Sequence, residues 1–121
     1  MILHKAKQTA SVVVILMVTL LLAVFNVEAK DRDHDTVIDA LGQANGIALS
    51  CGYSTVVQEI KIAMVRYSPK LAEYRETFFN ATNSFFIKQN SDDITCPSQD
   101  DLRIAAQADI AALKKLSKPK K

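Results

Sequence analysis

The chain has 121 residues, a formal net charge of +2 and two cysteines. This length allows one small domain, and the near-balance of charge excludes a broadly basic surface that would bind nucleic acid. The sequence also has no Gly-rich phosphate loop, no Cys-x-x-Cys and no His-Glu-x-x-His. We therefore expect a protein that is not an enzyme, uses no cofactor and binds no nucleic acid.

Residues 1–29 have the three-part pattern of a secretory signal peptide. A short positive segment is followed by an almost unbroken aliphatic run from Val12 to Phe25, and small or modest residues precede a cut after Ala29. The alternative is an uncleaved anchor, because no charge occurs from Gln8 to Val27, a stretch that could just span a bilayer. Either interpretation predicts an exported protein, periplasmic or secreted, whose domain is residues 30–121.

The first predicted helix of this domain carries a one-sided apolar stripe with alternating spacings of four and three residues. Asp33 and Asp35 precede the stripe, as anions do at a helix start, and Gly52 stands just past its end. Gly42 and Gly46 lie inside the helix, where close packing against another helix is one possible reason for them. The stripe consists of Val37, Leu41, Ala44, Ala48 and Cys51.

Two further helices are predicted in the middle of the chain. The second should start near Thr55, which forms a capping-box pair with Gln58, and should end where Ser68-Pro69 interrupts the pattern. The third should run roughly from Pro69 to Gln89, with Ser68 as its cap and Pro69 in its first turn. It is the most apolar of the set.

A fourth helix should follow Ser98, which has Asp101 three residues on, and should end at Lys118-Pro119. Residues 114–121 form a basic tail with five lysines. The expected fold is therefore all-α: a small antiparallel bundle of about four helices, preceded by an N-terminal signal helix. Contact with a membrane is expected only through an uncleaved N-terminus or weakly through the lysine-rich tail.

Cys51 and Cys96 both lie in the exported part of the chain. An even number of cysteines in a short exported chain predicts a disulfide, and two cysteines allow only one intramolecular pairing. This bond would join the end of the first helix to the start of the fourth, closing a loop of about 46 residues.

The best candidate for metal chemistry is the acidic segment before the first helix. Asp31, Asp33 and Asp35 match the first ligand spacings of a calcium loop, but Thr36 stands where that loop needs glycine. Position 12 of the same spacing is Gly42 instead of glutamate. We therefore predict no metal site and keep the three aspartates only as weak candidates for a divalent cation.

The pair Phe78-Phe79 recurs seven residues later as Phe85-Phe86. Phe78 and Phe85 share the predicted core stripe of the third helix, whereas Phe79 and Phe86 lie about 100° round and form a second apolar stripe. A helix buried on two sides would explain this pattern, and so would a surface that binds a partner or a second copy. The predicted contact residues are Phe79, Phe86 and Ile87. If Phe79 and Phe86 bind a partner, both should be exposed in the monomer.

These features predict an exported helical protein that acts by binding a macromolecular partner, for example as an inhibitor or an immunity-type protein. In architecture alone it resembles immunity proteins against secreted cell-wall amidases and acid-activated chaperones. One alternative function is therefore an acid-stress or general periplasmic chaperone. Another is a membrane-anchored envelope assembly component, which would suit an uncleaved N-terminus.

Overall fold

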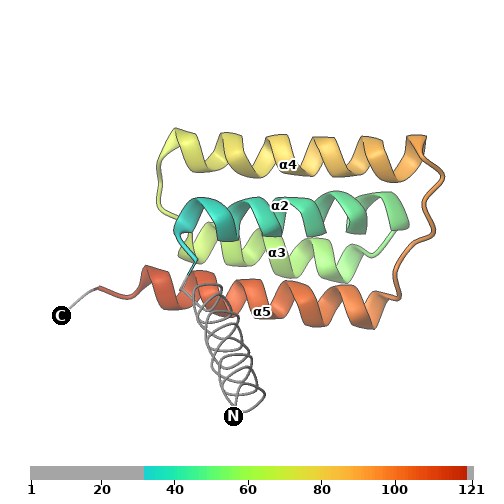
Figure 1. The fold of residues 1–121 in the computed structure, drawn as a ribbon. Helices are drawn as coiled ribbons and strands as arrows, with labels where there is room; N and C mark the ends of the chain where they lie inside the picture. Colours follow the sequence, from blue (N-terminus) through green and yellow to red (C-terminus); the bar gives the residue numbers. More distant parts are fainter. Residues whose placement is uncertain (1–31, 120–121) are drawn as a thin grey trace, which may run out of the picture. The chain divides into compact units, whose positions relative to one another are not determined.

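The computed structural model describes residues 32–119, which form four α-helices and no strand (Figure 1). This confirms the all-α fold, the number of helices and the helical bundle. No helix in this range is long and apolar enough to span a membrane. The predicted signal peptide and Asp31 lie outside the described residues. The helices are α2 (His34–Cys51), α3 (Ser54–Tyr67), α4 (Ala72–Ser91) and α5 (Gln99–Ser117).

Asp33 is the N-cap of α2. Its carboxylate accepts a hydrogen bond of 2.9 Å from the backbone N–H of Thr36, which satisfies one of the free donors at the helix start. At the other end, Gly52 adopts the left-handed conformation (φ 75°) and its N–H donates to the last turn. The predicted start and end signals of this helix are therefore both used.

Asp33→Asn should remove the part of the stability of α2 that depends on the charge of the Asp33 carboxylate and therefore on pH. The hydrogen bond from Thr36 lowers the pKa of the Asp33 carboxyl below its usual value. Stabilisation by the charged form is therefore complete above the unfolded pKa of about 3.9 and is lost as pH falls through the lower folded pKa. Asparagine caps a helix equally well but does not titrate. Melting temperatures should favour the wild type at pH 7 and converge as the pH falls through the folded pKa of Asp33, and a constant difference would contradict this role.

The start of α3 lies within one residue of the predicted position, but the predicted capping is wrong. The helix begins at Ser54, and its N-cap is Tyr53, which makes no side-chain capping bond. The predicted pair of Thr55 and Gln58 therefore lies inside the helix, where it forms no capping box. Tyr53 is held by other contacts, because its N–H donates to the carbonyl of Ala48 at the end of α2.

The start of α4 lies three residues later than predicted. Ser68 ends α3 instead of starting α4: it is extended (ψ 138°), as a residue before proline prefers, and its N–H donates to the carbonyl of Met64. Lys70 then donates from its ammonium to the carbonyl of Val65. The segment after Pro69 therefore closes the end of α3, and α4 begins only at Ala72.

The signals around α5 are used as predicted. Ser98 is the N-cap, and its hydroxyl accepts a bond of 3.1 Å from the backbone N–H of Asp101. The helix continues to Ser117, so that Lys114 and Lys115 belong to its last turn. Cations there complement the negative end of the helix dipole. The first part of the basic tail is therefore helical.

Consecutive helices run in opposite directions, yet the closest pair, α2 and α4, is parallel (Figure 1). Side chains show the same order along both helices: Thr77 bonds to Asp35 near the start, and Ser50 bonds to Asn90 near the end. α2 contacts all three other helices, and α3 also contacts α5. By contrast, α4 contacts only α2. The described part is thus a three-helix core with α4 laid on α2.

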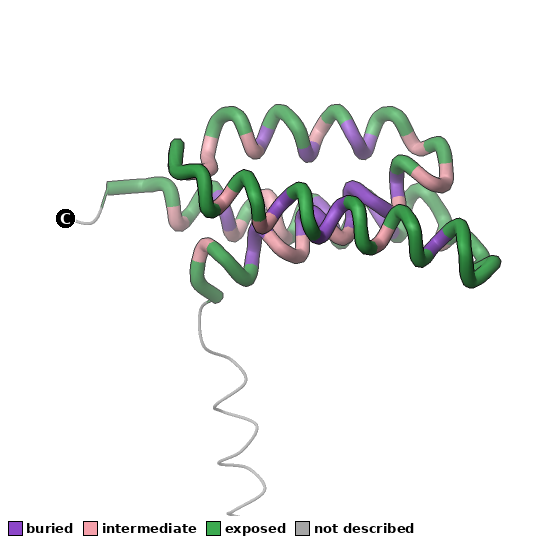
Figure 2. Tube along the Cα trace, turned by 90° about the horizontal axis from the view of Figure 1, so that it is seen from above, coloured by how far each residue is buried: buried purple, intermediate pink, exposed green. Residues whose placement is uncertain are grey.

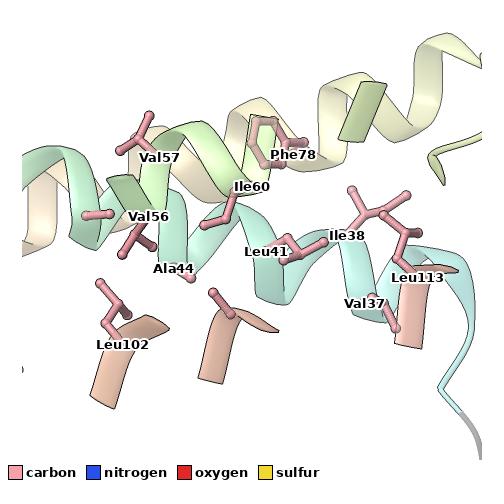
Figure 3. Close-up of a cluster of buried hydrophobic side chains, with 12 residues drawn as sticks. Val37, Ile38, Leu41, Ala44, Val56, Val57, Ile60, Phe78, Leu102 and Leu113 are labelled. Carbon is pink, nitrogen blue, oxygen red and sulfur yellow. The ribbon is translucent and has the colours of Figure 1, made fainter. Parts of the chain in front are cut away.

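The hydrophobic core lies where α2, α3 and α5 meet, and α4 adds Phe78 to it (Figure 3). Figure 2 shows the buried residues on the inward sides of the helices and the exposed residues on the outside. Because α2 faces several helices, both Val37 and Ile38 are fully buried although they are adjacent. The largest fully buried side chains are Ile38, Leu41, Ile60, Leu113, Val37 and Val56.

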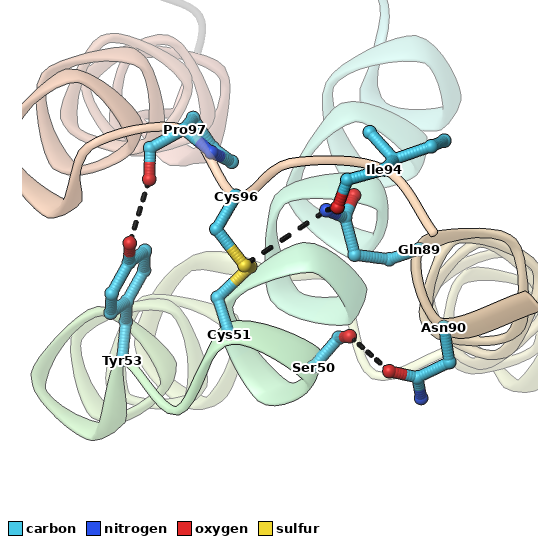
Figure 4. The surroundings of a disulfide bond; sticks show 8 residues. All are labelled: Ser50, Cys51, Tyr53, Gln89, Asn90, Ile94, Cys96 and Pro97. Atoms are coloured by element: carbon cyan, nitrogen blue, oxygen red, sulfur yellow. Dashed lines mark hydrogen bonds between the residues drawn. A yellow bond between two sulfur atoms is a disulfide. The ribbon is translucent and has the colours of Figure 1, made fainter. Parts of the chain in front are cut away.

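The disulfide between Cys51 and Cys96 is present, with a Cα–Cα distance of 5.9 Å (Figure 4). It confirms the predicted pairing and ties the end of α2 to the connection between α4 and α5. Hydrogen bonds hold this connection as well. The hydroxyl of Tyr53 donates to the carbonyl of Pro97 at 2.7 Å, and the amide of Gln89 donates to the carbonyl of Ile94 at 2.7 Å.

Candidate functional site

Phe79, Phe86 and Ile87 are all exposed on α4, with exposed fractions of 60%, 39% and 60%. Phe79 and Phe86 are seven residues apart and therefore share one side of the helix. Ile87 directly follows Phe86, which places it about 100° further round. The structure thus brings together the two phenylalanines but sets Ile87 on a different part of the α4 surface.

The inner side of α4 carries the other two phenylalanines. Phe78 is 9% exposed and belongs to the core cluster. Phe85 is only half-buried, in contrast to the predicted burial, and the ammonium of Lys88 lies 5.7 Å from the centre of its ring. The reason is that α4 packs on one helix alone, which covers only part of its inner side.

Two glycines of α2 determine how closely α4 can approach. A Cβ on Gly42 would lie 2.6 Å from the Cβ of Ala81 and 2.7 Å from the carbonyl oxygen of Phe78. A Cβ on Gly46 would meet the carbonyl oxygen of Thr82 and would lie 2.8 Å from the backbone nitrogen of Phe86. The backbones of α2 and α4 are therefore in direct contact, which fixes the position of Phe79 and Phe86.

A buried polar pair lies at the same contact. The amide of Asn45 donates to the hydroxyl of Thr82 at 3.3 Å, and this hydroxyl donates to the carbonyl of Gly42 at 3.2 Å. Asn45 is 3% exposed, and among the described residues its side-chain oxygen has no hydrogen-bond partner. The apolar stripe predicted for α2 did not include this asparagine.

An apolar groove of about 460 Å³ lies between α3 and α4. Met64 and Val65 line it from α3, whereas Phe78 and Phe79 line it from α4, and Pro69 lies between the two helices. Because α3 and α4 both pack on α2 but not on each other, the space between them is not filled by direct helix packing. Phe79 is therefore exposed to solvent and also forms part of one wall of this groove.

A second hollow of about 300 Å³ continues along α3. Lys61 lines both hollows, and the second one reaches Leu49 and Gly52 at the end of α2. The two hollows therefore follow one side of α3 over most of its length. The first hollow, which has α3 and α4 as its walls, is called the α3–α4 groove below; the second adjoins it at Lys61 and has no residue of α4 in its lining.

The charged side chains that line the α3–α4 groove are all cationic: Lys61, Lys70 and Arg75. The ion pairs of residues 32–119 are Arg32–Asp109 and Arg103–Glu59, and neither includes a groove residue. Lys70 does donate one hydrogen bond to a backbone carbonyl. The groove therefore combines an apolar lining with three positive charges that no acidic partner in the described chain neutralises.

The acidic residues near α2 have structural contacts. Asp33 caps the helix, and Asp35 accepts a bond of 2.8 Å from the hydroxyl of Thr77 on α4. The ring of His34 lies 5.8 Å from that of Tyr74. Within the described range, no three His, Cys, Asp or Glu side chains form a group that could hold a metal ion.

Comparison of the chain with models of protein families, with curated proteins and with solved structures found no match.

Proposed function

We propose that this protein is an exported binding protein that captures a protein partner through the side of α4 facing the α3–α4 groove. Phe79 and Phe86 would be the central contacts. The observation that carries the proposal is the 60% exposure of Phe79 beside an apolar groove. Aromatic side chains that anchor in or beside pockets contribute much of the binding energy of protein interfaces.

The surroundings of this surface favour a preformed binding site. The glycine contacts hold α4 against α2, and the disulfide restrains the connection that follows α4. A surface that is already in its bound shape loses less conformational entropy when a partner binds. This property suits an inhibitor or immunity-type protein better than a chaperone, which would have to loosen to expose apolar surface. We therefore propose that the protein acts by binding a partner and not by catalysis.

The double substitution Phe79→Asp/Phe86→Asp should abolish capture of the partner or self-association. The two side chains are exposed, so helicity and melting temperature should stay near those of the wild type. The measurement is a pull-down from the envelope of the source organism with quantified recovery, together with sedimentation for self-association. If this variant fails to fold, the two residues belong to the core and the proposed contact surface is wrong.

Ile87→Asp is the matched control. Ile87 has the same exposed fraction as Phe79 and lies on the same helix, but it directly follows Phe86 and so lies about 100° round the helix from the side that carries Phe79 and Phe86. We therefore expect this variant to recover the same protein as the wild type. Phe78→Ala is the opposite control, because it removes a buried side chain and should lower the melting temperature. If Ile87→Asp loses the partner and Phe79→Asp/Phe86→Asp keeps it, the binding surface lies on the outer side of α4 instead.

A further inference from the structure

Building on the proposed function, we propose that the partner inserts an amphipathic helix with acidic flanks into the α3–α4 groove. Apolar side chains of that helix would face Met64, Phe78 and Phe79. Aspartate and glutamate at its edges would face Lys61 on one wall and Arg75 on the other, with Lys70 near the end of the groove.

The form of the occupant follows from the walls of the groove. The described residues contain no β-strand, so an extended peptide would find no sheet edge with free backbone groups to pair with. A space between two helices that both pack on a third is instead where the ridges of another helix can pack. The two hollows together follow α3, a helix of 14 residues, over a length of about 21 Å, and the part that also has α4 as a wall begins at Lys61. A partner helix of about four turns would cover both hollows.

The charge of the occupant follows from the lining residues. Three cations and no carboxylate line the two hollows. The nearest acid along α4, Glu76, directly follows Arg75 and therefore lies about 100° round the helix from it. An acidic helix would pair with these cations on both walls, whereas a basic helix would be repelled by them.

The probes are two 16-residue amphipathic peptides with the same leucine stripe, one with glutamate and one with lysine on its flanks. Binding is measured by fluorescence anisotropy to the protein expressed from the full chain and purified in the form that the host produces. We expect the glutamate peptide to bind at least about tenfold more tightly than the lysine peptide, with a preference that weakens as salt is added. Equal affinities would overturn the assignment.

Substitutions then test which residues cause the preference for the glutamate peptide. Lys61→Glu/Arg75→Glu should invert the order of the two peptides. Lys114→Glu/Lys115→Glu makes the same change in net charge on exposed residues of α5 and should leave the order unchanged. If both double variants change the preference equally, net charge is the cause and the groove is not the site. Phe79→Asp/Phe86→Asp should bind neither peptide.

Two further measurements separate other occupants. Vesicles of phosphatidylglycerol should not compete with the glutamate peptide, and competition by them would assign the groove to an anionic lipid instead. Sedimentation should show a monomer, and a dimer that Phe79→Asp/Phe86→Asp dissociates would assign the groove to a second copy. If that variant loses the natural partner while the peptides show no charge preference, the proposed function stands and the acidic helix is wrong.

Discussion

Gly46→Leu should separate α4 from α2 and lower the free energy of unfolding by about 3 kcal/mol or more, the upper end of what overpacking usually costs. A Cβ at this position already meets backbone atoms of Thr82 and Phe86, which no change of side-chain rotamer can move. The remaining carbons of leucine add to the conflict. Because α4 contacts no other helix, the expected response is displacement of the whole helix.

The measurements are urea unfolding and binding of a dye that detects exposed apolar surface. Gly46→Ala should have a smaller effect of about 2 kcal/mol, because alanine favours the helix but its Cβ meets the same backbone atoms. Gly52→Ala is the control for the cost of changing a glycine. Nothing lies within 4 Å of a Cβ there, so only its positive φ opposes alanine, at about 1 kcal/mol. Equal losses at positions 46 and 52 would contradict a packing role for Gly46.

The apolar pattern of the first predicted helix captured part of what the structure buries. Val37, Leu41 and Ala48 are buried as the spacing of four and three residues indicated. Ile38 and Asn45 are buried as well, because α2 contacts three helices, whereas a one-sided stripe assumes a single buried face. The number of neighbours of a helix is a tertiary property, and local spacing does not contain it.

The helix starts show where local signals compete. Ser98 caps α5 as predicted, because no other helix end lies close enough in the chain to compete for its hydroxyl. Ser68 had two possible functions, the end of one helix or the start of the next. The structure shows the first, because the following proline keeps Ser68 extended and Lys70 binds the last turn of α3.

The candidate site was predictable only in part. The seven-residue repeat of paired phenylalanines indicated that Phe79 and Phe86 form a second apolar stripe, but it left open whether this stripe is buried or exposed, and the structure shows it exposed. The groove beside it was not indicated, since it depends on the parallel contact of α2 with α4 and on the gap between α3 and α4. One signal was present: Lys61 and Val65 are four residues apart and therefore lie on one side of α3, next to Met64. Only the folded structure shows that this side of α3 lies opposite α4.

Cys51→Ser/Cys96→Ser should lower the free energy of unfolding by about 4 kcal/mol, through the unfolded state more than the folded one. The bond joins residues 45 apart in sequence, and the chain-entropy model assigns about this amount to a loop of that length. For a domain of this size the melting temperature should fall by about 15–30 °C. At low temperature the helical circular dichroism and the binding of the glutamate peptide should be unchanged, because contacts such as that of Tyr53 with Pro97 still hold the connection before α5.

Tyr53→Phe is the matched control for this region. It removes the hydrogen bond to Pro97 but keeps the disulfide and the aromatic ring, so the expected loss is only about 1 kcal/mol. Adding a reductant to the wild type should reproduce the effect of the double serine variant, and the same reductant should leave that variant unchanged. If reduction shifts the melting temperature by less than the Tyr53→Phe substitution does, the stability of the domain comes from its three-helix core, and the disulfide contributes little to it.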